Sequence, residues 1–181
     1  ITVSRMPTRE FEGYAMAGFG ENDRIELKGA VGGPLTDVLS FRLAARSVKD
    51  DGYTEDLDPR GTNTIDDQDL RAYRGVLRIE PSENVRLDLQ YDYSDFENGN
   101  TSVYPTDSLG AGIVLGAVAN GSIHETRNNT PSFMKWNTGG PTATLDVGIG
   151  DHATMTYVFS KRDFEMDFLF NTDGTQVEIT R

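Results

Sequence analysis

The side chains that most often carry out acid–base or nucleophilic catalysis are scarce in this sequence. It contains two histidines, and neither His124 nor His152 has another histidine near it. No Gly-x-Ser-x-Gly elbow occurs, and the glycine-rich stretch from 110 to 121 lacks the Gly-Lys-Ser/Thr of a phosphate-binding loop. The absence of cysteine excludes disulfides and thiolate metal sites. We therefore expect no catalytic residue, no bound cofactor and no enzymatic activity.

An acidic segment is the one place where the sequence could hold a metal ion. Residues 50 to 69 contain eight acids and a single base, Arg60. Hard divalent cations take several oxygen ligands, and the weak candidates are Asp50, Asp51, Asp56 and Asp58. The Asp-x-Asp-x-Asp-Gly spacing is absent, so the sequence favours a solvated acidic loop over a cation site.

Five arginines recur at positions that share one face of the strands described below. They are Arg42, Arg46, Arg74, Arg78 and Arg86. A row of arginines on a confined surface can attract an anion or contact another part of a protein. Pairing with neighbouring acids such as Glu26, Glu80 and Asp88 across adjacent strands is the alternative, and the sequence favours it.

Aromatic side chains gather in a long segment without clear periodicity, from about 95 to 141. Tyr104 and the single tryptophan, Trp136, lie there, and Tyr53 lies in the acidic segment. Stacking on such rings would suit a sugar or an aromatic chelate. Packing of the segment on itself would account equally well for the rings.

Charge and hydropathy exclude several classes of protein. The 29 acids against 17 lysines and arginines give a net charge of −12, which argues against a nucleic-acid-binding protein and a polybasic membrane-surface module. The longest apolar run, from 109 to 119, is too short for a membrane-spanning helix, which needs about 20 residues. The chain begins without methionine, and we expect it to be a piece of a longer protein.

Period-two alternation of apolar and polar residues predicts antiparallel strands. The clearest pair is 73–80 and 85–93, joined by the tight turn Pro81–Asn84. Further strands are predicted at 11–19, 25–31, 39–46, 144–149 and 153–159, the last continuing through 164–168 after a shift at 160–163.

The connections between these strands alternate in length. Short turns at 34–37, 81–84 and 150–152 alternate with long loops at about 49–70 and 95–141. Transmembrane β-barrels place short turns at one end and long loops at the other. The sequence therefore predicts an all-β, antiparallel up-and-down meander of about seven strands from a larger transmembrane barrel. A soluble β-sandwich that binds a ligand such as carbohydrate is the alternative.

Several segments, in order, resemble the start of the barrel in TonB-dependent outer-membrane receptors. They are Phe11–Tyr14, Gly20–Val31, Gly33–Arg46, Asp51–Tyr53, Arg74–Pro81, Leu87–Tyr93, Tyr157–Phe164 and Asn171–Thr175. The leading stretch Ile1–Thr8 resembles the end of the plug domain that closes such barrels. The resemblance covers nearly the whole chain except the loop from about 94 to 141.

This resemblance implies an outer-membrane location and import of a scarce nutrient of the siderophore–iron, cobalamin or carbohydrate class, driven through TonB. Residues 1–9 would then end the plug and link it to the barrel, and residues 10–181 would form the N-terminal part of the barrel. The partners implied are the plug, the remaining strands, outer-membrane lipid, the nutrient, and TonB through a box that this sequence lacks. The five arginines, with Tyr53, Tyr104 and Trp136, would be contacts to substrate or plug.

Overall fold

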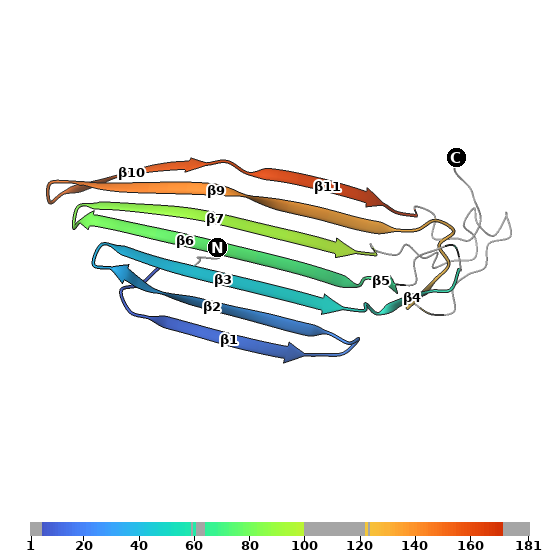
Figure 1. The fold of residues 1–181 in the computed structure, drawn as a ribbon. Coiled ribbons are helices and arrows are strands. Elements are labelled where there is room, and N and C mark those ends of the chain that lie inside the picture. Colours follow the sequence, from blue (N-terminus) through green and yellow to red (C-terminus); the bar gives the residue numbers. More distant parts are fainter. Residues whose placement is uncertain (1–4, 59, 61–63, 100–121, 123, 172–181) are drawn as a thin grey trace.

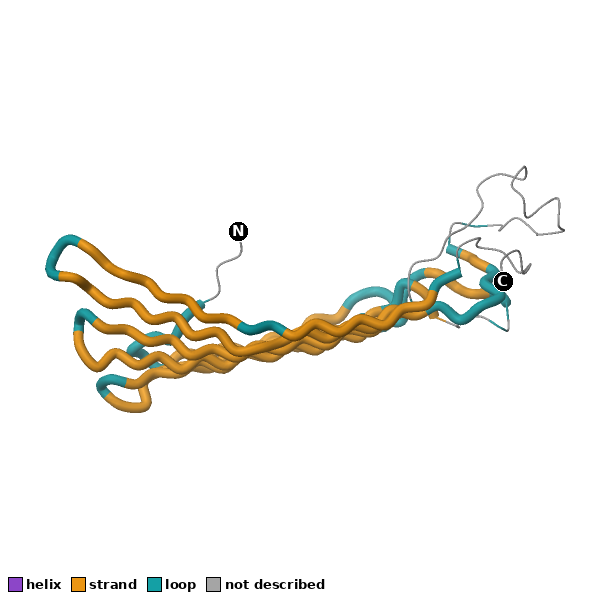
Figure 2. The backbone as a smooth tube through the Cα atoms, turned by 90° about the horizontal axis from the view of Figure 1, so that it is seen from above, coloured by secondary structure: helices purple, strands orange, loops and turns teal. Residues whose placement is uncertain are grey.

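The computed structural model describes residues 5–58, 60, 64–99, 122 and 124–171. Within these ranges the chain forms one long antiparallel sheet with the order β1-β2-β3-β6-β7-β9-β10, and β11 also pairs with β9 (Figure 1). Seen from above in Figure 2, the sheet is a single layer. No helix in the described part is long and apolar enough to cross a membrane. The predicted all-β meander is confirmed.

The main sheet consists of β1 (Glu12–Phe19), β2 (Ile25–Thr36), β3 (Leu39–Asp50), β6 (Gln68–Ser82), β7 (Val85–Asn98), β9 (Phe133–Ile149), β10 (Ala153–Ser160) and β11 (Asp163–Leu169). A small second sheet lies beyond one end of it, near the β4 and β5 labels in Figure 1. Its strands are β4 (Thr54–Asp56), β5 (Thr64–Ile65) and β8 (Glu125–Thr126), with β4 in the middle.

The central strands run further than the alternation predicted. β9 begins at Phe133, inside the segment expected to be loop, and β7 continues to Asn98. β9 has 17 residues, more than the 9–11 that a tilted strand needs to cross a bilayer. At about 3.3 Å per residue, its length is roughly 50 Å. The extra residues lie at the end of the long loops, beside the small sheet.

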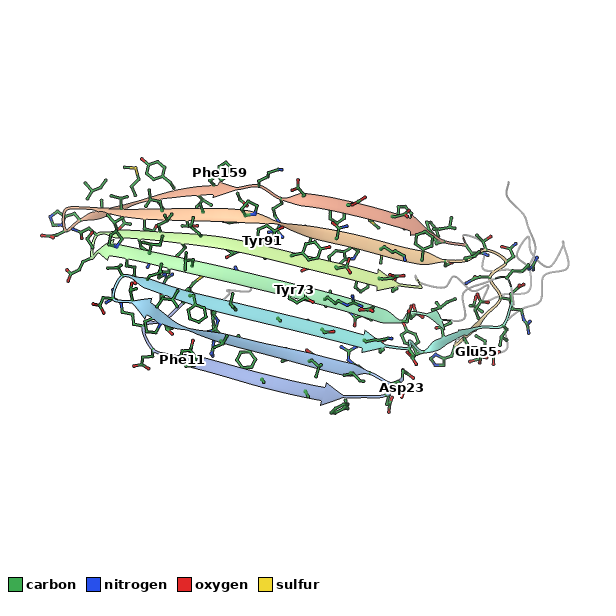
Figure 3. All side chains as sticks on the ribbon, viewed as in Figure 1. Phe11, Asp23, Glu55, Tyr73, Tyr91 and Phe159 are labelled. Carbon is green, nitrogen blue, oxygen red and sulfur yellow. The ribbon has the colours of Figure 1, made fainter. Side chains whose placement is uncertain are left out.

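One face of the main sheet is apolar and uncovered, and we call it the apolar face. Residues paired across strands share a face, and one such row joins Phe41, Leu77 and Leu89. In the next row Leu43 and Tyr91 are 53% and 57% exposed. Figure 3 shows Tyr73 and Tyr91 on the two central strands. A β-sandwich would bury these side chains against a second sheet, and no such layer covers them in the described chain.

The opposite face, which we call the polar face, carries most of the charged side chains of the central strands. It does not form a conventional hydrophobic core either, because only four hydrophobic residues of the described chain, proline and glycine aside, are buried. These are Ala30, Val48, Ile65 and Val76. The sheet therefore has too little apolar burial of its own for a stable soluble domain of this size.

The apolar positions of the last two strands change face between β10 and β11. Tyr157 and Phe159 pair with apolar-face residues of β9, whereas Phe164 pairs with Thr138 on the polar face. Ser160 pairs with Thr142 and Asp163 with Gly139, so the register itself does not shift. The predicted continuation of this strand is present, but its apolar side chains point to the opposite face.

Gly140 allows the backbone of β9 to lie close to the segment that connects β10 and β11. Its φ is +155°, and a Cβ there would lie 2.0 Å from the carbonyl oxygen of Lys161. The amide of Lys161 donates a hydrogen bond to the Pro141 carbonyl at 3.1 Å, which holds the two segments together. A side chain at position 140 would force them apart.

We expect Gly140→Ala to destabilise the sheet by about 2 kcal/mol or more, because the backbone must move and its φ is unfavourable for alanine. Gly18→Ala is the matched control, since a Cβ there meets its nearest neighbour at 3.8 Å. Unfolding of both variants in detergent micelles, followed by circular dichroism against urea, measures the difference. Equal midpoints for the two variants would contradict the assigned role of Gly140.

Candidate functional site

Ion pairs across neighbouring strands cover the polar face. Arg78 and Asp88 lie directly opposite each other and form two hydrogen bonds of 2.7 and 2.9 Å. Three more of the predicted arginines form ion pairs with acids. Arg86 pairs with the residue opposite it, Arg46 pairs diagonally with a residue of β2, and Arg42 reaches across Gly32 of β2 to β1. The shortest contacts are Arg42 to Glu12 at 2.7 Å, Arg46 to Glu26 at 3.0 Å and Arg86 to Asp146 at 2.5 Å. This face is thus a wall of largely neutralised charge.

Arg74 is the exception among the five predicted arginines. The residue opposite it is Asp92, but both carboxylate oxygens of Asp92 accept hydrogen bonds from Arg162, at 3.0 and 2.6 Å. Arg74 instead donates to the neutral amide oxygen of Gln90 at 2.5 Å. Its Nε is buried and has no hydrogen-bond partner.

Close to the loop end, the polarity of the two faces is inverted. The polar face here carries an apolar set that we call the aromatic row. It consists of Val48, Leu70, Phe96, Trp136 and Met166, joined by cross-strand pairing. The rings of Phe96 and Trp136 stack with their centroids 5.3 Å apart and their planes at 21°.

The other face carries charge at the same level. Its next two rows contain Arg71, Asp95, Asn137 and Glu165, then Lys49, Asp69, Glu97, Lys135 and Asp167. Sequence reasoning placed Phe96 and Trp136 in a loop because it searched for one apolar face along the whole strand. An apolar alternation continuing on the other set of positions is the signal that would have placed both residues in strands.

The predicted acidic cation candidates are divided between two environments. Asp50 ends β3 and pairs with Arg24 at 2.5 Å, and Asp51 is exposed. Asp56 and Asp58 are buried beside the small sheet, at 8% and 7% exposure. Among the described residues no three His, Cys, Asp or Glu side chains are grouped closely enough to hold a metal ion.

The two buried aspartates have opposite electrostatic environments. Burial raises the pKa of Asp56, although its Oδ1 accepts hydrogen bonds from the amides of Asp58 and Asn128, at 3.1 and 3.0 Å. The other oxygen, Oδ2, is buried without a partner. The side-chain hydrogen bonds from Arg60, at 2.9 and 2.7 Å, lower the pKa of Asp58 to about 2.

The other two predicted aromatic contacts, Tyr53 and Tyr104, do not belong to the aromatic row. Tyr53 is 60% exposed, and its ring meets His124 edge-on with the centroids 6.0 Å apart. Tyr104 lies outside the described residues.

The fold is similar to that of two solved structures. One is the ferripyoverdine receptor of the outer membrane of Pseudomonas aeruginosa bound to ferripyoverdine, with a TM-score of 0.69 and 20% sequence identity. The other is the FpvAI–pyocin S2 complex, with a TM-score of 0.66 and 18% identity. Each likeness covers 87% of this chain and 20% of the other, so the chain spans about a fifth of those receptors. No family model and no curated protein matches the sequence.

We expect Asp58→Asn to loosen the segment around Arg60. The variant loses a charge-assisted pair, and because Arg60 is exposed we expect the loss to be about 1 kcal/mol. The pair stabilises the folded segment above the ordinary aspartate pKa, and this contribution disappears as the pH falls towards 2. The rate of trypsin cleavage after Arg60 at pH 8 should rise several-fold.

Asp56→Asn is the matched control, with the opposite expectation. The amide keeps the oxygen that accepts from Asp58 and Asn128 but removes a buried, incompletely paired charge. Because burial raises the pKa of Asp56, its ionisation opposes folding at neutral pH. Cleavage in this variant should be no faster than in the parent protein, and faster cleavage would contradict the interpretation.

Proposed function

We propose that this chain is part of a TonB-dependent outer-membrane receptor, which imports a scarce nutrient through a barrel closed by a plug. The observation that supports the proposal most directly is the uncovered apolar face, bounded by charged rows at the loop end. A bilayer would cover the apolar band, and water would solvate the charged rows beyond it. Similarity to the fold of outer-membrane receptors supports the same conclusion.

The dimensions of the apolar band fit a bilayer. On β7 it extends from Val85 to Tyr93, about 26 Å along the strand at about 3.3 Å per residue, and Asp95 follows it on the same face. Tyrosines at 73, 91 and 93 lie close to the charged end of the band, where aromatic girdles are usual. In this arrangement the polar face lines the lumen of the barrel.

The aromatic row is the proposed contact for the nutrient. It lies on the lumen side at the end that carries both long connections, and so faces the compartment from which a nutrient arrives. Stacked rings bind flat or sugar-like groups with an advantage of about 1 kcal/mol beyond the buried area. The siderophore–iron, cobalamin and carbohydrate classes all contain such groups.

The remaining parts of the mechanism depend on segments outside this chain. Residues 1–9 are proposed to end the plug, and residues 10–181 to form the first strands of the barrel. A TonB box preceding the plug would receive energy from the inner membrane. A barrel of this kind needs strands that pair with the free edges of β1 and of β10 and β11.

Placement in the membrane is tested by adding one charge to the apolar face. We expect Leu89→Arg, in the middle of the band, to lower the folding free energy into lipid vesicles by about 2–4 kcal/mol. The matched variant is Asn137→Arg, which lies on the same face among the charged rows, and it should cost less than about 1 kcal/mol. Equal costs for the two variants would contradict the membrane boundary.

The nutrient site is tested through the fluorescence of Trp136, the single tryptophan of this chain. In a complete receptor whose other tryptophans are replaced, we expect one class among ferric siderophores, cobalamins and oligosaccharides to quench or shift this emission saturably. Phe96→Ala should weaken that binding about tenfold, because the stacked ring is lost.

Tyr73→Ala serves as the matched control. It removes a ring of similar size from the apolar face and should leave the affinity unchanged. If both variants bind like the parent protein, the aromatic row is not the nutrient site, whatever the receptor imports.

A further inference from the structure

A basic groove on the polar face carries more positive charge than the sheet neutralises. It has a volume of about 750 Å³ and lies across β1, β2, β3 and β6. Arg5, Lys28, Arg42 and Arg74 line it, with Ala44 and Val76 among the apolar residues beside them. No aspartate or glutamate lines the groove within the described chain.

Counting the ion pairs around this groove leaves cations in excess. Glu12 binds Arg42, Glu26 is shared by Lys28 and Arg46, and Asp92 binds Arg162. Three carboxylates therefore serve four cations. Arg74 is a fifth cation, which donates its hydrogen bond to the amide of Gln90 because Arg162 binds Asp92, the carboxylate opposite it. The excess of cations follows from how the strands pair. Asp92 lies opposite Arg74, but Arg162 binds its carboxylate.

Arg74 is also the least satisfied of these cations. Its Nη2 donates to Gln90 at 2.5 Å, but its Nε is buried without a partner. A guanidinium withdrawn from water normally binds a carboxylate, preferably through two parallel hydrogen bonds. A bidentate carboxylate reaching Arg74 through the groove would engage the free Nε and balance the charge.

The shape of the groove and the course of the chain favour a polypeptide as the occupant. Small side chains at positions 30 and 44 create the hollow, and Tyr14 and Met16 border it with apolar surface. The segment preceding β1 already runs along this face, where the Pro7 carbonyl accepts a hydrogen bond from Arg78 at 3.3 Å and Arg9 lies 3.5 Å from Glu80. A domain attached to this segment would meet the groove directly.

We propose that Arg74 anchors the domain inside the barrel by binding an aspartate or glutamate of that domain, with neighbouring apolar side chains of the same segment packed on the floor of the groove. This inference rests on the proposed function, because it requires a lumen occupied by a plug. Arg74 then acts as a docking residue of the wall, whereas the other four arginines hold the strands of the wall to one another.

The experiment replaces Arg74 by p-benzoyl-phenylalanine in the complete receptor and crosslinks it in outer membranes. Mass spectrometry should find position 74 joined to a plug peptide that contains an aspartate or glutamate. A folded barrel whose position 74 crosslinks only to barrel strands, or to nothing, overturns this inference alone. A complete protein that forms no heat-modifiable barrel overturns the proposed function together with it.

A second measurement separates docking from guidance of an anionic nutrient. In Arg74→Gln we expect the plug to become susceptible to protease at a lower urea concentration while the barrel remains folded. Arg86→Gln, which breaks the pair with Asp146 near the turn end, should leave the plug midpoint unchanged. In the Arg74→Gln background, replacing the crosslinked acid by glutamine should not lower further the urea concentration at which the plug becomes susceptible to protease. A change in nutrient affinity with an unchanged plug midpoint would overturn the inference.

Discussion

A single-layered sheet with one apolar and one charged face needs a different environment on each side, and this constraint governs the rest of the structure. The backbone groups of the inner strands are satisfied by their neighbours, so the strands can enter a medium without water. The side chains decide which medium each face meets. Leu43, Leu89 and Tyr91 are exposed on the apolar face, and burying them in lipid removes the cost of that exposure.

On the polar face, ion pairs between strands take the role that lipid contact has on the apolar face. Arg78 opposite Asp88 neutralises charge within the sheet and links two strands at once. Water excluded from the lumen by a plug would strengthen such pairs and increase the cost of any cation left without one. The polar face is therefore nearly neutral, and Arg74 is the predicted arginine whose opposite carboxylate is bound by another cation.

The boundary of the proposed membrane explains why the two faces exchange character along the same strands. Beyond the proposed bilayer the apolar face would meet water, and there charged residues such as Glu97 and Lys135 replace the tyrosines of the band. The inner face at that level no longer needs the paired charges of the wall and can present rings, as Phe96 and Trp136 do. The exchange between β10 and β11 occurs without a change in register, so a shift in strand pairing does not cause it.

Alternation by itself determined the strands along the apolar band, their order and the short turns between them, because there each strand has one apolar and one polar face. Alternation did not predict the loop ends of β7 and β9. There the apolar residues lie on the polar face and the charged residues on the apolar face, so a search for a single apolar face along the strand fails. The residue types also suggested that arginines would pair with acids. Only the tertiary structure decided that Arg162 binds Asp92 and that Arg74 donates to the amide of Gln90 instead, because that outcome depends on which strands lie side by side and in what register.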